Sequence, residues 1–163
     1  MFRIGFGYDV HRLTEDRPLI LGGVEIPHHK GLEGHSDADV LTHSVIDALL
    51  GAAGKGDIGT HFPDNDPKYR GANSLQLLRK AFDLVGNDGY ELNNLDATIV
   101  AQEPVLMKYI PHMCRKIAEI FNISESRINI KATTTESLGF CGRKEGIEAY
   151  AVLSLGMPAE ESP

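Results

Sequence analysis

The segment from Ile147 to Leu155 constrains the fold more than any other, because its apolar residues fall on both faces of the strand that they predict. Ala151, Val152 and Leu153 follow one another with no polar residue between them. A strand of this kind needs a cover on each face of its sheet. A chain of 163 residues is too small to supply both covers with ease, so we expect the chain to form an oligomer.

The rest of the chain alternates between strand-like and helix-like apolar spacing. Spacings of three and four residues predict helices at 41–54, 74–86 and 111–121, and strands are predicted at 2–10, 19–26, 95–101 and 128–133. Ser36 or Asp37 is expected to cap the first helix, and Gly22-Gly23 marks a turn or bulge. This order predicts one α/β (α+β) domain of two layers, a mixed β-sheet packed against helices. We place the domain at residues 1–157 and a short flexible tail at 158–163.

The composition excludes several classes of partner. The formal net charge is -7, from 23 acidic and 16 basic residues, which repels a nucleic-acid backbone. No apolar run is long enough to span a membrane, and the N-terminus shows no signal sequence, so we expect a cytoplasmic protein. Cys114 and Cys141 are expected to be reduced.

Asp9 and His11 are two residues apart in a predicted strand, and this spacing points both side chains to one face. His43 lies on the predicted helix that follows, from which it can reach the same point. Two histidines and one carboxylate are a ligand set for zinc with an open fourth position, and Asp39 or Asp47 could orient His43. Taken alone, the same residues also fit ordinary half-buried, hydrogen-bonded histidines.

Two further segments carry polar groups that suit a phosphorylated ligand. The residues Gly34 to Asp37 precede a predicted helix, where free backbone amides can bind an anion, although a simple cap explains them as well. The turn-rich segments 57–59 and 62–66 contain carboxylates that could bind sugar-like hydroxyls or could simply be solvated.

A third polar segment, Lys131 to Glu136, leaves a predicted strand and leads into a glycine-rich turn. Its three threonines are typical of a strand. Together with Glu136, however, they offer hydroxyls, amides and a hard carboxylate for an ion such as Mg²⁺.

Taken together, five motifs in this order are specific to one family: Gly5–His11, His35–Asp39, Gly56–Gly59, Phe62–Asp64 and Lys131–Glu136. From about residue 3 to residue 155 the chain resembles the 2-C-methyl-D-erythritol 2,4-cyclodiphosphate synthase family of the non-mevalonate isoprenoid pathway. Members of this family are metal-dependent phosphorus–oxygen lyases. The resemblance implies conversion of 4-diphosphocytidyl-2-C-methyl-D-erythritol 2-phosphate to the cyclic diphosphate and CMP.

The resemblance also implies a homotrimer with active sites between subunits. One zinc ion per subunit would be held by Asp9, His11 and His43, and Glu136 would place Mg²⁺ or Mn²⁺ on the substrate diphosphate. His35 and Thr134 would stabilise the transition state. The substrate contacts implied in the same way are Ser36, Asp57, Ile58, Gly59, Phe62, Pro63, Asp64, Asn65 and Asp66, then Ala101, Pro104, Leu106, Met107, Ala132 and Thr133 around the cytidine, and finally Phe140 and Arg143.

One position departs from the family pattern. Where the family commonly has a lysine after the Ala101–Pro104 segment, this chain has Val105, so that side-chain contact to the nucleotide cannot form. Backbone recognition of cytosine remains open, and Lys108 lies a turn away. The same residues also fit a metal-dependent phosphohydrolase or a non-catalytic trimeric metal- or nucleotide-binding module. The combination of His35, Thr134 and Glu136 argues against the binding module, because binding alone does not need all three.

Overall fold

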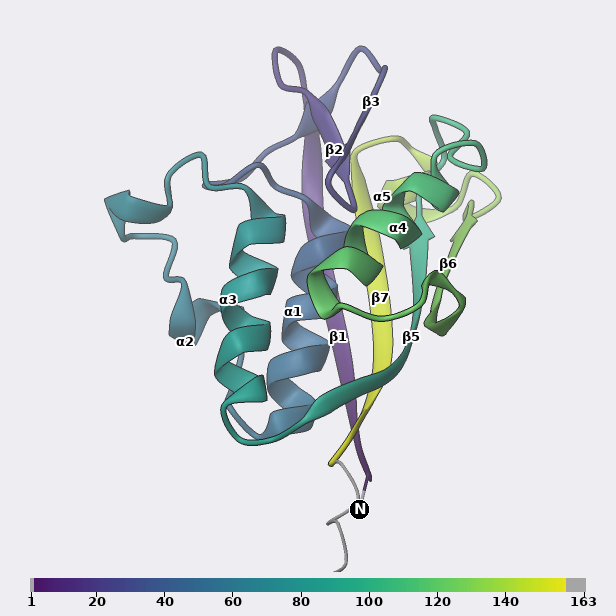
Figure 1. Cartoon of the computed structure of the whole chain (residues 1–163). Helices are drawn as coiled ribbons and strands as arrows, with labels where there is room; N and C mark the ends of the chain where they lie inside the picture. The colour runs from purple at the N-terminus through teal and green to yellow at the C-terminus, as the bar shows by residue number, and fades with distance from the viewer. Residues whose placement is uncertain (1, 158–163) are drawn as a thin grey trace, which may run out of the picture.

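The computed structural model describes residues 2–157, and the tail predicted at 158–163 lies outside them. Five strands form one sheet in the order β4-β1-β7-β5-β6 (Figure 1). Their bounds are β1 (Phe2–Thr14), β4 (Gly31–Leu32), β5 (Glu91–Val100), β6 (Ile128–Thr133) and β7 (Gly146–Gly156). The β5–β6 pair is parallel and the other pairs are antiparallel, which confirms the mixed sheet in a single α/β domain.

The three long helices occur where the apolar spacing predicts them. They are α1 (Val40–Ala53), α3 (Ser74–Gly86) and α4 (Ile110–Phe121), and Figure 1 shows them on one side of the sheet. The predicted cap of α1 is wrong, because the N-cap is Asp39, whose carboxylate accepts a hydrogen bond from the N–H of Thr42. None of the described helices has the length and apolarity needed to cross a membrane.

Short elements fill the connections. Gly22 and Gly23, both with positive φ, turn the chain between β2 (Leu19–Leu21) and β3 (Val24–Ile26), which pair as a hairpin. The polar segment before α3 contains α2 (Ile58–His61) and the 3₁₀ turn η1 (Pro67–Tyr69), and later connections contain η2 (Glu125–Arg127) and α5 (Gly139–Gly142). Cys114 and Cys141 are free, as expected.

Two glycines bring α1 unusually close to β1. A Cβ atom at Gly5 would lie 1.8 Å from the carbonyl oxygen of Ala48, and one at Gly7 would lie 1.9 Å from that of Ser44. No side chain fits at either position, so the strand and the helix are in direct backbone contact. This contact sets the distance from His43 on α1 to Asp9 and His11, which continue the same face of β1.

The last strand, β7, is expected from its sequence to need a cover on both of its faces, and within one chain only one face is covered. Ile147, Ala149, Ala151, Leu153 and Leu155 are buried beneath the helices, and none is more than 1% exposed. On the opposite face, Val152 is 45% exposed and Tyr150 36% exposed. The same face of β1 is apolar and equally open, with Phe2, Ile4, Phe6, Tyr8 and Val10 exposed. One chain therefore leaves an apolar sheet face uncovered.

Candidate active site

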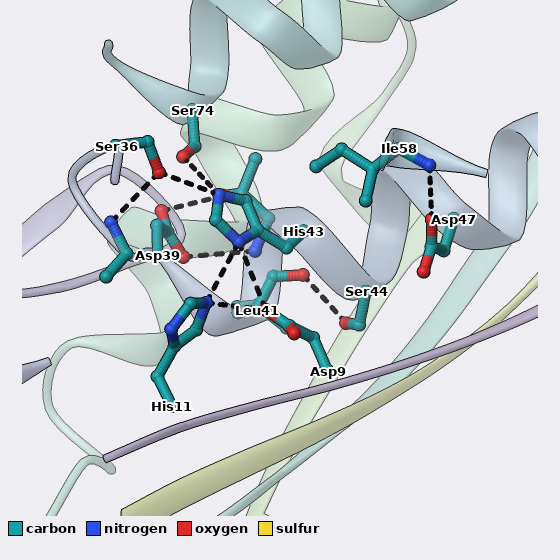
Figure 2. A network of polar contacts seen from close by, with 12 residues as sticks. Asp9, His11, Ser36, Asp39, Leu41, His43, Ser44, Asp47, Ile58 and Ser74 are labelled. Atoms are coloured by element: carbon teal, nitrogen blue, oxygen red, sulfur yellow. Dashed lines mark hydrogen bonds and ion pairs between the residues drawn. The ribbon is translucent and has the colours of Figure 1, made fainter. Parts of the chain in front are cut away.

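Asp9, His11 and His43 converge on one point at the N-terminal part of α1 (Figure 2). The Oδ2 atom of Asp9 is 3.0 Å from Nε2 of His11 and 3.1 Å from Nδ1 of His43, and those two nitrogens are 3.2 Å apart. Ligands bound at typical zinc distances in a tetrahedron are separated by about 3.3 Å. The three atoms therefore already have the spacing of three corners of a tetrahedral metal site, as the sequence predicts.

The same proximity changes the proton affinities of the group. Burial favours the neutral carboxyl of Asp9, but hydrogen bonds and charge from His11 and His43 outweigh burial and lower its pKa to about 2. Burial likewise opposes the charged form of His11, yet Asp9 overcomes this effect and raises the pKa of His11. Without a metal, a negative carboxylate is thus held against an imidazole that readily takes a proton.

The other nitrogen of each histidine is fixed from outside the cluster. His11 Nδ1 lies 2.7 Å from the carbonyl oxygen of Glu33, and a carbonyl can only accept, so Nδ1 carries the proton. His43 Nε2 lies 2.8 Å from Oγ of Ser74 and 3.2 Å from Oγ of Ser36. Ser74 in turn donates a hydrogen bond to the carboxylate of Asp37. These contacts leave His11 Nε2 and His43 Nδ1 free to bind a metal.

The predicted role of Asp39 or Asp47 in orienting His43 is wrong. Asp39 is fully buried and accepts hydrogen bonds from the N–H groups of Gly22, Gly23 and Thr42, so it ties α1 to the β2–β3 hairpin. Asp47 accepts a hydrogen bond of 2.8 Å from the N–H of Ile58 instead. The sequence could not separate these aspartates from Asp37, because all of them lie on or just before the same helix.

A cavity of about 160 Å³ opens over the metal cluster, and we call it the metal pocket. Nine of the predicted site residues line it: Asp9, His11, His35, Ser36, His43, Ile58, Gly59, Phe62 and Asp64. Gly34, from the segment considered for anion binding, lines it as well. Tyr69 and Leu77 also line it and were not predicted, because they follow the pattern of turn and core residues.

Other predicted contacts lie around the metal pocket without lining it. Asp57 caps α2 through the N–H and hydroxyl of Thr60, while Pro63 and Asn65 are absent from the lining. Asp66 caps η1 with its carboxylate, and its carbonyl oxygen lies 3.2 Å from Nε2 of His35. This segment therefore positions His35 through its backbone.

The amides just before α1 are not free to bind an anion. The N–H of Asp37 donates to the carbonyl of Ala72, that of Ala38 to Oγ of Ser36, and that of Asp39 to the carboxylate of Asp37. These three N–H groups therefore take part in local capping and are not available for anion binding.

A second cavity, of about 280 Å³, lies between the β5–α4 connection and the end of β6, and we call it the apolar pocket. The predicted residues that line it are Ala101, Pro104, Leu106, Met107, Ala132, Thr133 and Thr134. Gln102, Val105 and Ile110 line it as well. Val105 thus borders the pocket with an apolar side chain where the family pattern has a cation.

The turn after β6 is held in an uncommon backbone conformation. Glu136 and Ser137 have φ values of 54° and 66°, in the left-handed region that non-glycine residues seldom adopt. Oγ1 of Thr134 donates to the Glu136 carboxylate at 3.2 Å, and the N–H of Ser137 donates to the side chain of Gln102 at 3.1 Å. The turn presents an exposed carboxylate beside the apolar pocket.

Phe140 and Arg143, also predicted as ligand contacts, line neither pocket. Phe140 belongs to α5 and is 37% exposed, and Arg143 is paired with Glu145 at 2.9 Å. Their contact with a ligand stays a prediction.

The two pockets are separated across the sheet of one chain. Asp9 pairs with Ala149, Ala149 with Ile99, and Ile99 with Ala132, so the metal cluster and the end of β6 lie at the same level. Three steps between strands separate them, which is about 14 Å. His35 therefore lies with the metal cluster, whereas Thr134 and Glu136 lie with the apolar pocket.

Comparison with known proteins gives a consistent result. A model of the YgbB family matches residues 2–156. The 2-C-methyl-D-erythritol 2,4-cyclodiphosphate synthase of Geotalea daltonii is 60% identical over 161 residues, which cover 99% of this chain and 94% of that protein. Among solved structures, the bifunctional IspDF of Campylobacter jejuni superposes with a TM-score of 0.93 at 49% identity, covering 96% of this chain and 42% of that one. A 2C-methyl-D-erythritol-2,4-cyclodiphosphate synthase in a CDP-bound form gives a TM-score of 0.87 at 38% identity, covering 94% and 100%.

Proposed function

The chain belongs to the YgbB family and catalyses the CMP-releasing cyclisation of 2-C-methyl-D-erythritol 2,4-cyclodiphosphate synthases, and on this premise we propose how its residues divide the work. The observation that carries the proposal is the convergence of Asp9, His11 and His43 to within 3.2 Å. The chemistry of the reaction demands charge neutralisation, since a protein of net charge -7 has to accept a triply phosphorylated substrate.

Asp9, His11 and His43 are the residues that hold zinc, one ion per subunit. The donor set of two imidazoles and a carboxylate and the ligand spacing both fit. Bound there, the ion supplies positive charge to phosphate oxygens. Glu136, with the Thr134 hydroxyl beside it, is the oxygen-donor group for Mg²⁺ or Mn²⁺ on the diphosphate.

The two pockets take the two ends of the substrate. The methylerythritol part occupies the metal pocket, against the 57–59 and 62–66 segments. The cytidine part occupies the apolar pocket. A related synthase has been solved in a CDP-bound form, which supports a cytidine diphosphate ligand. Most side chains that line this pocket are apolar, and the polar ones are Gln102, Thr133 and Thr134. Val105 offers no polar group, so cytosine is recognised through backbone groups rather than through a side chain at that position.

The reaction needs no protein nucleophile. An oxygen of the 2-phosphate attacks the β-phosphorus of the same molecule in line, and the bond from that phosphorus to the CMP oxygen breaks. The residues act by positioning and by stabilising charge, with His35 and Thr134 donating hydrogen bonds to the phosphoryl oxygens. The segment 62–66 helps to exclude water, which would otherwise give a linear product.

The active site is completed by a second subunit of a homotrimer. The metal pocket and the apolar pocket of one chain lie about 14 Å apart across the sheet, and each carries only part of the predicted catalytic set. The uncovered face of β1 and β7, with Phe2, Ile4 and Phe6 more than 60% exposed, is an apolar surface of the kind that a subunit interface buries.

Mixed trimers test this arrangement. His43→Ala removes a group of the metal pocket and Thr134→Ala removes one beside the apolar pocket, so each variant alone is inactive. If each site uses one pocket from each of two neighbours, random mixing of equal amounts restores about one quarter of the sites. A site built within one chain restores none, because every subunit then carries one defect.

Product analysis tests the roles of the residues. Wild-type protein incubated with substrate, zinc and magnesium should give CMP and the cyclic diphosphate with no inorganic phosphate, as seen by phosphorus NMR and mass spectrometry. Glu136→Gln should lower kcat at least 100-fold and leave the affinity for CMP nearly unchanged. Glu125→Gln, an equivalent change at an exposed position in η2, is the matched control. A linear bisphosphate from the wild-type protein would instead indicate a hydrolase.

A further inference from the structure

A second group of metal-binding side chains lies outside both pockets. His28 and His29 belong to the connection between β3 and β4, and Glu103 belongs to the connection between β5 and α4. Each residue offers one ligand atom, and these atoms all lie within 4.8 Å of one another. Segments that are far apart in the sequence thus bring two imidazoles and a carboxylate together at one place.

His28 has one ring nitrogen that is buried. Its Nε2 atom is buried and has no hydrogen-bond partner among the residues that the structure describes. A buried polar atom without a partner is costly, and an imidazole nitrogen is the atom that transition metals bind.

The third ligand is a carboxylate that is already charged. Glu103 forms an ion pair with Lys144, whose Nζ atom is 2.7 Å from Oε2, and this contact lowers the pKa of Glu103. The Lys144 side chain is 51% exposed, so it can turn into solvent when another cation takes its place. The rings of His28 and His29 are 4.3 Å apart between centroids, close enough to serve one ion.

We propose that His28, His29 and Glu103 form a second metal site, which takes a dication of borderline softness such as Zn²⁺, Co²⁺ or Ni²⁺. Ligands at about 2.1 Å from one ion are separated by about 3.0 Å in neighbouring octahedral positions or about 3.4 Å in tetrahedral ones, so ligand atoms up to 4.8 Å apart close the site by moving about 1 Å each. The bound ion joins the β3–β4 connection to the β5–α4 connection. Because Pro104 lines the apolar pocket, the ion braces one wall of that pocket.

Equilibrium dialysis of the whole protein against Zn²⁺, followed by elemental analysis, tests the proposal. Wild-type protein should bind two ions per chain, and His43→Ala should retain one. His28→Ala and Glu103→Gln should each lower the affinity for the more weakly bound ion, the one at His28, His29 and Glu103, at least tenfold. His112→Ala, which removes an exposed histidine of α4, should change nothing and is the matched control.

Three results would overturn the proposal. The wild-type protein could saturate at one ion, His28→Ala could keep both ions, or Glu103→Gln could keep full affinity at the weaker site. The last result would mean that the histidine pair alone captures the metal without the carboxylate. Circular dichroism of the variants shows that any loss of metal does not come from unfolding.

Discussion

Two groups of identical donors, two histidines and one carboxylate, occur in very different settings in this molecule. Asp9, His11 and His43 come from a strand and a helix in backbone contact, and their ligand atoms lie 3.0–3.2 Å apart. His28, His29 and Glu103 come from two connecting segments, and their ligand atoms lie within 4.8 Å of one another. The first group needs no movement to bind a metal, whereas the second has to close around it.

The groups that hold the ligand side chains in place also favour the first group. In the first group the nitrogen of each histidine that faces away from the metal is hydrogen-bonded, to Glu33 in one case and to Ser74 in the other. In the second group the carboxylate is engaged by Lys144. Such partners commonly change metal affinity by about 10- to 100-fold. The comparison teaches that the scaffold, more than the identity of the donors, decides which group is ready to bind a metal without movement.

We call Asp9, His11 and His43 the tight group. The largest effect is expected when a ligand of this group is removed. His43→Ala leaves two ligands, so the variant should lose most of its zinc at the first centre and at least about 1,000-fold in kcat/KM. The chain should still fold, because the surrounding core does not depend on this side chain. Elemental analysis and thermal unfolding check both statements, and a full zinc complement at the first centre would contradict the assignment.

A smaller effect is expected from the hydrogen bond behind the same ligand. Ser74→Ala breaks the path from His43 to Asp37 and should weaken zinc binding about 10- to 100-fold. Ser44→Ala is the matched control, since Ser44 is buried in the same helix as His43 but its hydroxyl donates to the carbonyl of Leu41 (Figure 2). Competition with a chromogenic chelator measures both affinities. Equal losses in the two variants would mean that packing, rather than the hydrogen bond, is responsible.

The tight group was predictable from the sequence because periodicity fixes its geometry. Asp9 and His11 share a face by the two-residue period of a strand, and the helical spacing around His43 is clear. The glycines Gly5 and Gly7, four and two residues before Asp9, carry the signal for the close contact with α1. The five motifs of the family then identified the reaction.

The rest could not be predicted because it depends on contacts between segments that have no common period. Ser74, the partner of His43, begins α3, 31 residues later in the chain. Leu77 reaches the metal pocket because α3 packs beside α1, and Tyr69 reaches it from η1. No spacing in the sequence relates His28 and His29 to Glu103, and only the fold brings these residues together.

The tight group should also leave a pH signature on the metal-free protein. The pKa of Asp9 is lowered to about 2, so its contribution to stability is present above its usual pKa and is lost as the pH falls through 2. The pKa of His11 is raised, so its contribution is present below 6.5 and is lost as the pH rises through the raised value. Both contributions coexist between about pH 4 and 6.5.

We compare wild-type protein and Asp9→Asn after a chelator has removed the metal from both. The free energy of unfolding of the wild-type protein should be higher by about 2 kcal/mol near pH 5, and by less at pH 8. Urea unfolding at the two pH values measures the difference. Glu103→Gln is the comparison from the loose group, His28, His29 and Glu103, and should show no such dependence, because the ion-pair partner of Glu103 is Lys144 and not a histidine. A constant difference from pH 5 to pH 8 would show that His11 and Asp9 are not coupled.

The smallest effect is expected at Lys144, which competes with a metal for Glu103. Lys144→Ala removes both the competing ion pair and a positive charge that repels the dication, so the weaker metal site should gain about two- to fivefold in affinity. The gain is small because both partners of the ion pair are partly solvated, and it should shrink as salt screens the charge. Lys131→Ala removes an ion pair of similar exposure, with Asp96 at 2.6 Å, and should leave the affinity unchanged. Proteins that carry one zinc ion per chain, at the tight group, are titrated with Ni²⁺ in a calorimeter at two salt concentrations to measure the difference. A loss of affinity in Lys144→Ala would mean that Lys144 holds Glu103 in place for the metal instead of competing with it, and the loose group would then be more preorganised than its distances indicate.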